Sequence, residues 1–296
     1  MPSSFLENFN LFYKINFDFS KNIKNIGSAI LLPISDYYKF LSLLIKRNNG
    51  KIISFQHGGL FGMRKFSPDD LINNYYSDVN LLWHDKNGIG PAYFDKNQST
   101  KNTNKRTGIL LFPTINLFQE MTENLKKCNH IYLNPYWNFY SLISPKLKKI
   151  TKIKLFNHPN SKKLRKIWVD RYSEDLLLDI KSYKGNLYKN FKITIIDNFS
   201  TPLFELLYQY EPFIIINNSK LLEFTHEFKL IIRELKKLNL LFSSEKKASQ
   251  FLNKNYSNLD VWWDDIKNNV NYKKLRNKLF PVNNFNKRKL INKINR

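Results

Sequence analysis

The sequence predicts an α/β protein built on parallel β-sheets, and three observations support this fold class. Short apolar segments of strand length alternate with amphipathic segments of helix length along most of the chain. Several of the apolar segments end in glycine, histidine, serine or threonine, and ligands bind at the carboxyl ends of strands in open α/β sheets. The 296 residues are 42% hydrophobic and 15% aromatic, which is enough to build a substantial core.

The first 95 residues contain one predicted βαβ unit. Residues 28–34 form an apolar segment that predicts a strand, and residues 36–46 have the apolar spacing of a helix. The polar Asn-Asn-Gly at 48–50 ends that helix, and residues 51–55 predict the second strand. Residues 79–83 predict a further short strand. This order favours parallel pairing, with the polar residues after position 55 at the carboxyl end of a strand.

A polar, charged segment without apolar periodicity, residues 96–106, predicts a linker between domains 1–95 and 107–296. The second domain repeats the alternation of strands and helices. Its predicted strands are 108–112, 130–133, 152–156, 191–196 and 212–216, and its clearest predicted helices are 115–127, 203–210 and 228–241. From about residue 223 onward the pattern predicts helices alone. The pair Trp262-Trp263 is more typical of helix packing than of a site.

Composition restricts the partners and the compartment. The formal net charge of +24 favours an anionic partner, such as a nucleotide phosphate or an anionic membrane surface, although a solvated coat of lysines explains it as well. No nucleic-acid recognition motif accompanies the charge. Cys128 is the single cysteine, which excludes an intrachain disulfide, and no apolar run approaches the ~20 residues of a spanning helix. We expect a cytoplasmic protein, with peripheral contact to the inner membrane as a further possibility.

The segment after the strand at 51–55 is the first candidate site. It contains Gln56, His57 and the glycines Gly58, Gly59 and Gly62, which let backbone approach a ligand closely. An imidazole at a strand end is suited to acid–base chemistry. The alternative is a glycine-rich turn with a hydrogen-bonded histidine.

Two later strand ends predict a phosphate-binding site. Ser200 and Thr201 begin a helix, where hydroxyls and unpaired amide groups bind anions, and Glu205 lies one turn further on, where it could accept hydrogen bonds from a ribose. Simple capping of the helix explains the same residues. His158, held extended by the proline that follows it, could contact a diphosphate. The sequence contains no clustered metal-ligand spacing, so we expect no metal.

The chain resembles the C-terminal half of GT-B-type transferases from bacterial O-antigen loci, which are distantly similar to CDP-glycerol glycerophosphotransferases and capsule polysaccharide transferases. The resemblance covers nearly the whole chain, and the Gln-His-Gly-Gly segment and the late pair of tryptophans are its most specific parts. The matching segments are residues 1–7, 55–62, 77–83, 200–205, 211–212, 244–248 and 262–263.

The resemblance implies two Rossmann-like domains of the GT-B type, of which the N-terminal one is truncated to its last βαβ unit. It implies a metal-independent transferase that moves a glycosyl or glycerophosphate-type group from a nucleotide-activated donor to a glycan or lipid-linked acceptor in surface polysaccharide synthesis. No cofactor beyond the donor is implied. His57 would then be the base, His158, Ser200 and Thr201 would contact donor phosphates, and Glu205 the ribose. The alternative is a non-catalytic nucleotide- or glycan-binding subunit. In either case a separate chain could supply the missing half.

Overall fold

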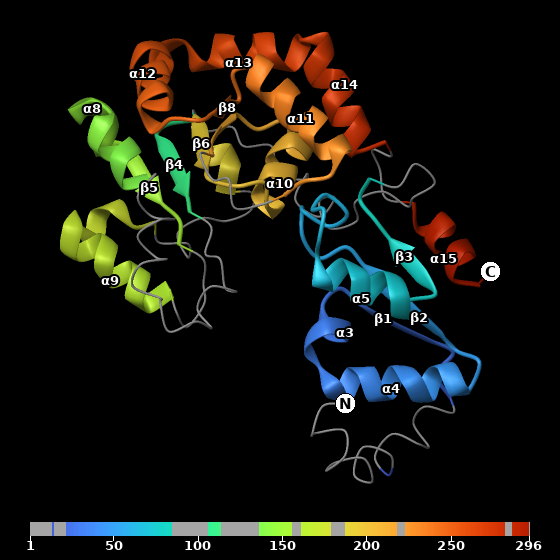
Figure 1. Ribbon diagram of the computed structural model, residues 1–296. Coiled ribbons are helices and arrows are strands. Elements are labelled where there is room, and N and C mark those ends of the chain that lie inside the picture. The colour runs from blue at the N-terminus through green and yellow to red at the C-terminus, as the bar shows by residue number, and fades with distance from the viewer. Residues whose placement is uncertain are drawn as a thin grey trace. The chain divides into compact units, whose positions relative to one another are not determined.

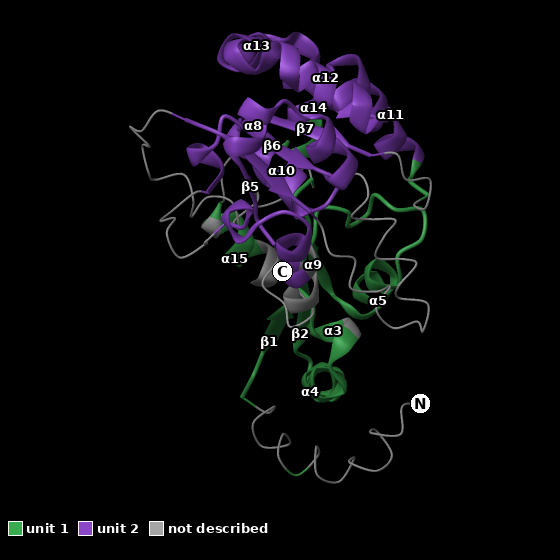
Figure 2. Cartoon of the chain, turned by 90° about the vertical axis from the view of Figure 1, so that its left-hand side faces the viewer, with its two compact units in different colours: residues 1–95, 223–225, 277–296 green, residues 96–222, 226–276 purple. Residues whose placement is uncertain are grey.

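The computed structural model describes residues 14, 22–84, 106–113, 136–155, 161–178, 187–217, 223–281 and 286–295. It divides the chain into two compact units (Figure 2). Unit 1 comprises residues 1–95, 223–225 and 277–296, and unit 2 comprises residues 96–222 and 226–276. Unit 1 therefore includes C-terminal residues that the sequence-based division assigned to the second domain.

Unit 1 is built on a parallel sheet with the strand order β1-β2-β3. The strands are β1 (Asn25–Ser28), β2 (Lys51–Phe55) and β3 (Val79–Leu81), and the main helices are α4 (Asp36–Arg47) and α5 (Pro68–Tyr76) (Figure 1). The hydroxyl of Ser35 accepts a hydrogen bond from the amide of Tyr38, which caps α4 at the position expected from the sequence. The predicted βαβ unit with parallel strands is therefore confirmed.

The expected strand over residues 28–34 is wrong. Strand β1 ends at Ser28, and Leu31–Ile34 form the short helix α3. The Ser28 hydroxyl accepts hydrogen bonds from the amides of Ile30, at 3.2 Å, and Leu31, at 2.9 Å. This local side-chain to backbone bonding turns the chain into a helix, although its apolar composition suits a strand.

Two segments from late in the sequence complete unit 1. Helix α15 (Lys287–Asn295) contributes Leu290, which packs against the buried Ile53 and Leu81 of the sheet. The second segment is Glu223–Thr225, which pairs antiparallel with residues 63–65. Its backbone bonds join the Lys65 amide to the Glu223 carbonyl, at 2.9 Å, and the Thr225 amide to the Met63 carbonyl, at 3.0 Å.

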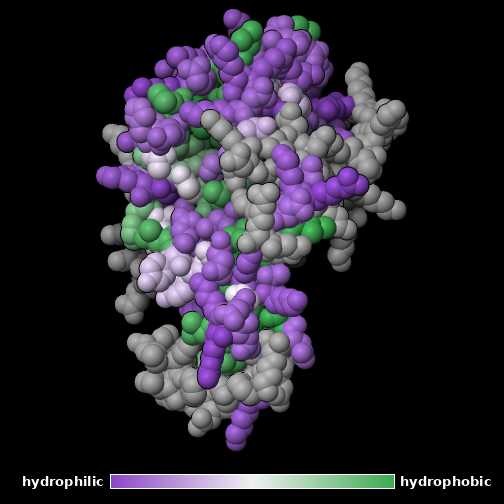
Figure 3. All heavy atoms as spheres, turned by 90° about the vertical axis from the view of Figure 1, so that its right-hand side faces the viewer, coloured by the Kyte–Doolittle hydropathy of each residue, from purple (hydrophilic) through white to green (hydrophobic). Residues whose placement is uncertain are grey.

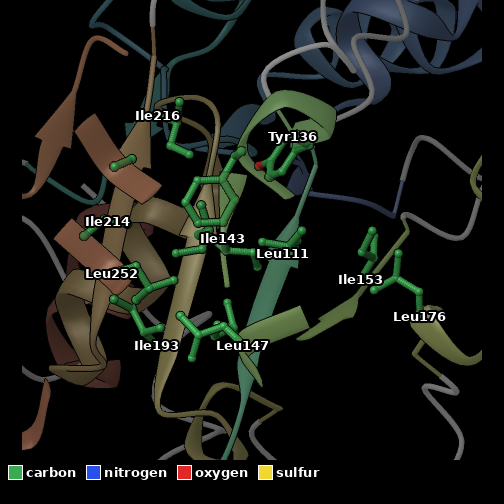
Figure 4. Close-up of a cluster of buried hydrophobic side chains, with 14 of the residues drawn as sticks. Leu111, Tyr136, Ile143, Leu147, Ile153, Leu176, Ile193, Ile214, Ile216 and Leu252 are labelled. Atoms are coloured by element: carbon green, nitrogen blue, oxygen red, sulfur yellow. The ribbon is translucent and has the colours of Figure 1, made fainter. Parts of the chain in front are cut away.

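Unit 2 is built on a parallel sheet with the strand order β5-β4-β6-β7-β8. The strands are β4 (Ile109–Phe112), β5 (Thr151–Ile153), β6 (Ile193–Ile196), β7 (Phe213–Ile216) and β8 (Leu241–Phe242). Every residue of β4, β6 and β7 is buried, as in parallel sheets that are covered on both faces. Figure 4 shows Leu111, Ile193 and Ile214 of these strands in the core together with Leu147 and Leu252 from helices.

The helices of unit 2 follow the strands and then form the C-terminal part of the unit. They are α8 (Pro145–Lys149), α9 (Ser161–Arg171), α10 (Thr201–Gln209), α11 (His226–Lys237), α12 (Glu245–Asn255), α13 (Leu259–Asn268) and α14 (Val270–Leu279), of which α14 continues into the residues of unit 1 after residue 276, with a 3₁₀ turn at Leu187–Asn190 (η4). The helix expected over 228–241 is α11, which begins two residues earlier, at His226. It ends earlier, at Lys237, because residues 241–242 form β8. The predicted elements at 115–127 and 130–133 lie outside the described residues.

Trp263 has the packing role that the sequence predicts. Its side chain is 3% exposed, its indole N–H donates to the carbonyl of Tyr210 at 2.9 Å, and its ring meets that of Phe213 at a centroid distance of 5.8 Å. The buried Arg276 on α14 donates to the carbonyls of Leu207 and Tyr208. These contacts fix α13 and α14 to the end of α10, where the last carbonyls of a helix need partners.

The described surface is largely hydrophilic. Figure 3 shows hydrophilic residues over most of the described part of one face, with smaller hydrophobic areas between them. Of the helices that the structure describes, none has the length and apolar character needed to cross a membrane.

Candidate active site

The glycine-rich turn after β2 is held by Gln56. This side chain is only 6% exposed, and it makes two hydrogen bonds to backbone. Its amide nitrogen donates to the Gly58 carbonyl at 2.8 Å, and its amide oxygen accepts from the Trp83 amide at 2.7 Å. The Gln56 backbone amide also donates to the Leu81 carbonyl at 3.0 Å. Gln56 therefore joins the turn to the end of β3, and its role in this structure is to position the turn.

Gly62 ends the turn in a conformation that favours glycine. Its φ is +70°, and a Cβ added there would lie 3.4 Å from Cε1 of His84. The Gly62 amide donates to the Asp70 carboxylate at 2.7 Å. Burial raises the pKa of Asp70, and the hydrogen bond from Gly62 opposes that shift. Gly62 is thus fixed by an acid on α5, and the imidazole of His84, which follows β3, lies in van der Waals reach of the position that a Cβ would occupy.

His57 lies at the carboxyl end of β2, between Gln56 and the glycines, and its side chain is exposed. Gly59 beside it is buried and Gly58 is half-buried. The surrounding turn is fixed by the bonds of Gln56 and Gly62, so the backbone that carries the imidazole is held in place. A histidine that is accessible to solvent on such a turn can receive a proton from a bound hydroxyl.

Replacing Gln56 with leucine should destabilise the protein by about 2–3 kcal/mol, because a partly buried carbonyl and a buried amide lose their partners. Urea unfolding measures the loss. The matched control is Gln250→Leu on the exposed face of α12, which should change stability by about 0.5 kcal/mol or less. Equal effects of the two substitutions would contradict the positioning role of Gln56.

The second group of predicted residues lies at the carboxyl edge of the sheet in unit 2. Ser200 and Thr201 follow β6 and begin α10, and Pro202 occupies the first turn of the helix. The Ser200 amide donates to the Asn198 side chain at 3.0 Å, and within this described segment the Ser200 hydroxyl makes no capping hydrogen bond. Simple capping by the Ser200 side chain, the alternative interpretation, is therefore not what the structure shows.

Glu205 is part of a polar group with Tyr188 and Lys154, which come from two other segments. The Tyr188 hydroxyl donates to its carboxylate at 2.5 Å, and the Lys154 ammonium interacts with it electrostatically. Lys154 lies over the ring of Phe112, at 4.5 Å from the ring centroid. Burial lowers the pKa of Lys154, and the charge of Glu205 opposes that shift. Sequence reasoning named Glu205 and missed Lys154 and Tyr188.

The structure groups some of the predicted residues and leaves others separate. Gln56, His57, Gly58, Gly59 and Gly62 form one turn in unit 1, whereas Ser200, Thr201 and Glu205 belong to one helix start in unit 2. His158 lies outside the described residues. Within the described ranges no group of three or more His, Cys, Asp or Glu side chains could hold a metal ion.

Two units with parallel sheets, each with polar residues after its strands, define an α/β protein compatible with the Rossmann-like class. The family model of the LIC12162 family transferase matches residues 1–287, so the chain belongs to this family of transferases. A comparison with curated proteins finds no match.

Proposed function

We propose that this transferase moves a glycosyl or glycerophosphate-type group from a nucleotide-activated donor to a hydroxyl of a glycan or lipid-linked acceptor. The observation that carries the proposal is the pair of polar strand ends, one with an exposed imidazole and one with hydroxyls at a helix start beside a lysine and a glutamate. The membership in a transferase family supports it. The proposal includes a GT-B arrangement and a role in O-antigen or capsule synthesis in the cytoplasm, with peripheral contact to the inner membrane.

In the proposed reaction the acceptor oxygen forms a bond to the transferred group while the bond between that group and the nucleotide phosphate breaks. His57 takes the proton of the acceptor hydroxyl, and the electron pair of the broken bond leaves with the phosphate. Ser200 and Thr201, with His158, donate hydrogen bonds to that phosphate, since hydroxyls at a helix start stabilise an anion. The Glu205 carboxylate, held by Tyr188, accepts from the donor ribose.

A ligand screen tests the donor. We expect one of the CDP-, UDP- or GDP-linked donors, or CMP, to raise the melting temperature, because a ligand at about 100 times its Kd adds ~2.7 kcal/mol to the stability of the folded state. A transfer assay with the stabilising donor then measures turnover. Stabilisation without turnover identifies a non-catalytic binding subunit. The absence of stabilisation by every nucleotide contradicts the proposal.

A further inference from the structure

Lys154 places a cation at the carboxyl ends of the strands in the unit 2 sheet. It follows β5 directly, and its backbone amide donates to the Leu111 carbonyl at 2.9 Å, so it extends the pairing of β5 with β4. Phe112, the last residue of β4, lies under its ammonium group at 4.5 Å. Residues at this carboxyl edge are the ones that contact ligands in open α/β sheets.

The surroundings of Lys154 differ from those of Lys192, a lysine at the amino-terminal ends of the strands in the same sheet. Lys192 precedes β6, its side chain is 15% exposed, and its ammonium group is paired with Asp260 at 3.1 Å and with the Ser257 carbonyl at 3.2 Å. Both ammonium groups lie over aromatic rings, that of Lys192 at 5.4 Å from the centroid of Tyr256, but the acid that interacts with Lys154, Glu205, also accepts a hydrogen bond from the Tyr188 hydroxyl. A bound anion would give the ammonium group of Lys154 neutralising contacts of the kind that Asp260 and the Ser257 carbonyl give to Lys192.

The start of α10 gives this position a second source of positive potential. Glu205 lies on α10, one turn after Thr201, so Lys154 interacts with the helix whose first amides are at the same edge of the sheet. Resting on the proposal of a nucleotide-activated donor, we propose that Lys154 binds the donor's diphosphate and stabilises the negative charge that develops on the leaving phosphate. Lys154 would then contact the donor's phosphates, and Glu205 would contact the ribose.

The competing interpretation is a structural role, in which Lys154 serves only to hold β5 near α10 through its electrostatic interaction with Glu205. The two interpretations differ in the effect of Lys154→Met, which weakens pyrophosphate binding if Lys154 contacts the phosphate and leaves it unchanged if Lys154 is structural. If Lys154 binds phosphate, removal of the neighbouring negative charge leaves pyrophosphate binding equal or tighter. If the role of Lys154 is structural, Glu205→Gln and Lys154→Met lower stability to a similar degree and leave pyrophosphate binding unchanged.

Calorimetric titration of the full chain with inorganic pyrophosphate, and in parallel with CDP, UDP and GDP, tests the proposal. The titrations use about 0.3 M salt to suppress non-specific binding to the basic surface. We expect Lys154→Met to weaken pyrophosphate binding by about tenfold or more, since a charge-assisted contact is lost. Lys154→Arg, which keeps the charge, should stay within about threefold of the wild type. The matched control, Lys192→Met, removes the same charge from the amino-terminal ends of the strands and should also bind within about threefold.

The outcomes separate this inference from the proposed function. If Lys154→Met binds pyrophosphate as tightly as the wild type does, the role of Lys154 is overturned, but the proposal of a nucleotide-activated donor is not affected. A wild type that binds neither pyrophosphate nor any nucleoside diphosphate overturns both. Equal weakening by Lys154→Met and Lys192→Met shows an effect of net charge alone and also overturns the inference. A selective loss in Lys154→Met, with Glu205→Gln binding as tightly as wild type or tighter, supports it.

Discussion

Replacing His57 with alanine should lower the rate of transfer by about 10²–10⁴-fold, the range that a general base contributes. The side chain is exposed at the end of β2, so its removal breaks no packing in the core. The bonds of Gln56 and Gly62, which fix the turn, remain in the variant. The rate is measured with the donor that stabilises the protein in the ligand screen, and the melting temperature should equal that of the wild type.

His226→Ala is the matched control. His226 is an exposed histidine at the first position of α11, and its replacement should leave the rate within about twofold of the wild type. Donor binding by His57→Ala should also be retained, because the proposal assigns the donor to residues of unit 2. Unchanged turnover by a folded His57→Ala protein would refute the base assignment, and lost donor binding would assign His57 to the donor instead.

The sequence predicts most of the described sheets because parallel strands buried on both faces appear as unbroken apolar runs. Residues 213–216 and 109–112 are examples, and every residue in them is buried. Residues 28–34 are also largely apolar, and they are wrongly predicted as a strand. The Ser28 hydroxyl accepts hydrogen bonds from two amides that follow it, and a helix begins there. Strand β8 is missed because a two-residue strand has no periodicity to detect.

The site is predictable where its residues are adjacent in sequence and not where they converge from distant segments. The glycines and the helix start have local signals, and both lie at strand ends as expected. Lys154 looks like one of many lysines, and only the fold brings it beside Phe112 and Glu205. His84 likewise lies near Gly62, a residue 22 positions earlier in the sequence, only because of the fold.

At the amino-terminal ends of the strands in the unit 2 sheet, Glu211 is a buried acid with an ion-pair partner. It is 2% exposed, and Arg106 contacts its carboxylate at 2.8 Å. Burial raises the pKa of Glu211, while the charges of Arg106, Lys189 and Lys267 oppose the shift. The ion pair joins the residues that precede β4 and β7, so it fixes the amino ends of two central strands.

Replacing Arg106 with methionine should destabilise the protein by about 3 kcal/mol at neutral pH, since it leaves a buried carboxylate without its closest cation. The loss should depend on pH. In the variant the pKa of Glu211 rises further, so the folded state holds its proton over a wider range than the unfolded state does. The free energy of unfolding of the variant then falls as pH rises from the ordinary pKa of a glutamate through the raised pKa of Glu211. The difference in this free energy between variant and wild type narrows toward about pH 4.5.

The double variant Arg106→Met with Glu211→Gln should recover most of the lost stability at neutral pH, because the amide carries no charge to bury. Urea unfolding of the four proteins of this cycle, at pH 7 and near pH 5, measures the coupling between the two residues. If the free energies of the two single substitutions simply add, the loss in Arg106→Met comes from the packing of the arginine side chain, and the account of a buried charge fails. A loss in Arg106→Met that is the same at both pH values would contradict the linkage to Glu211 directly.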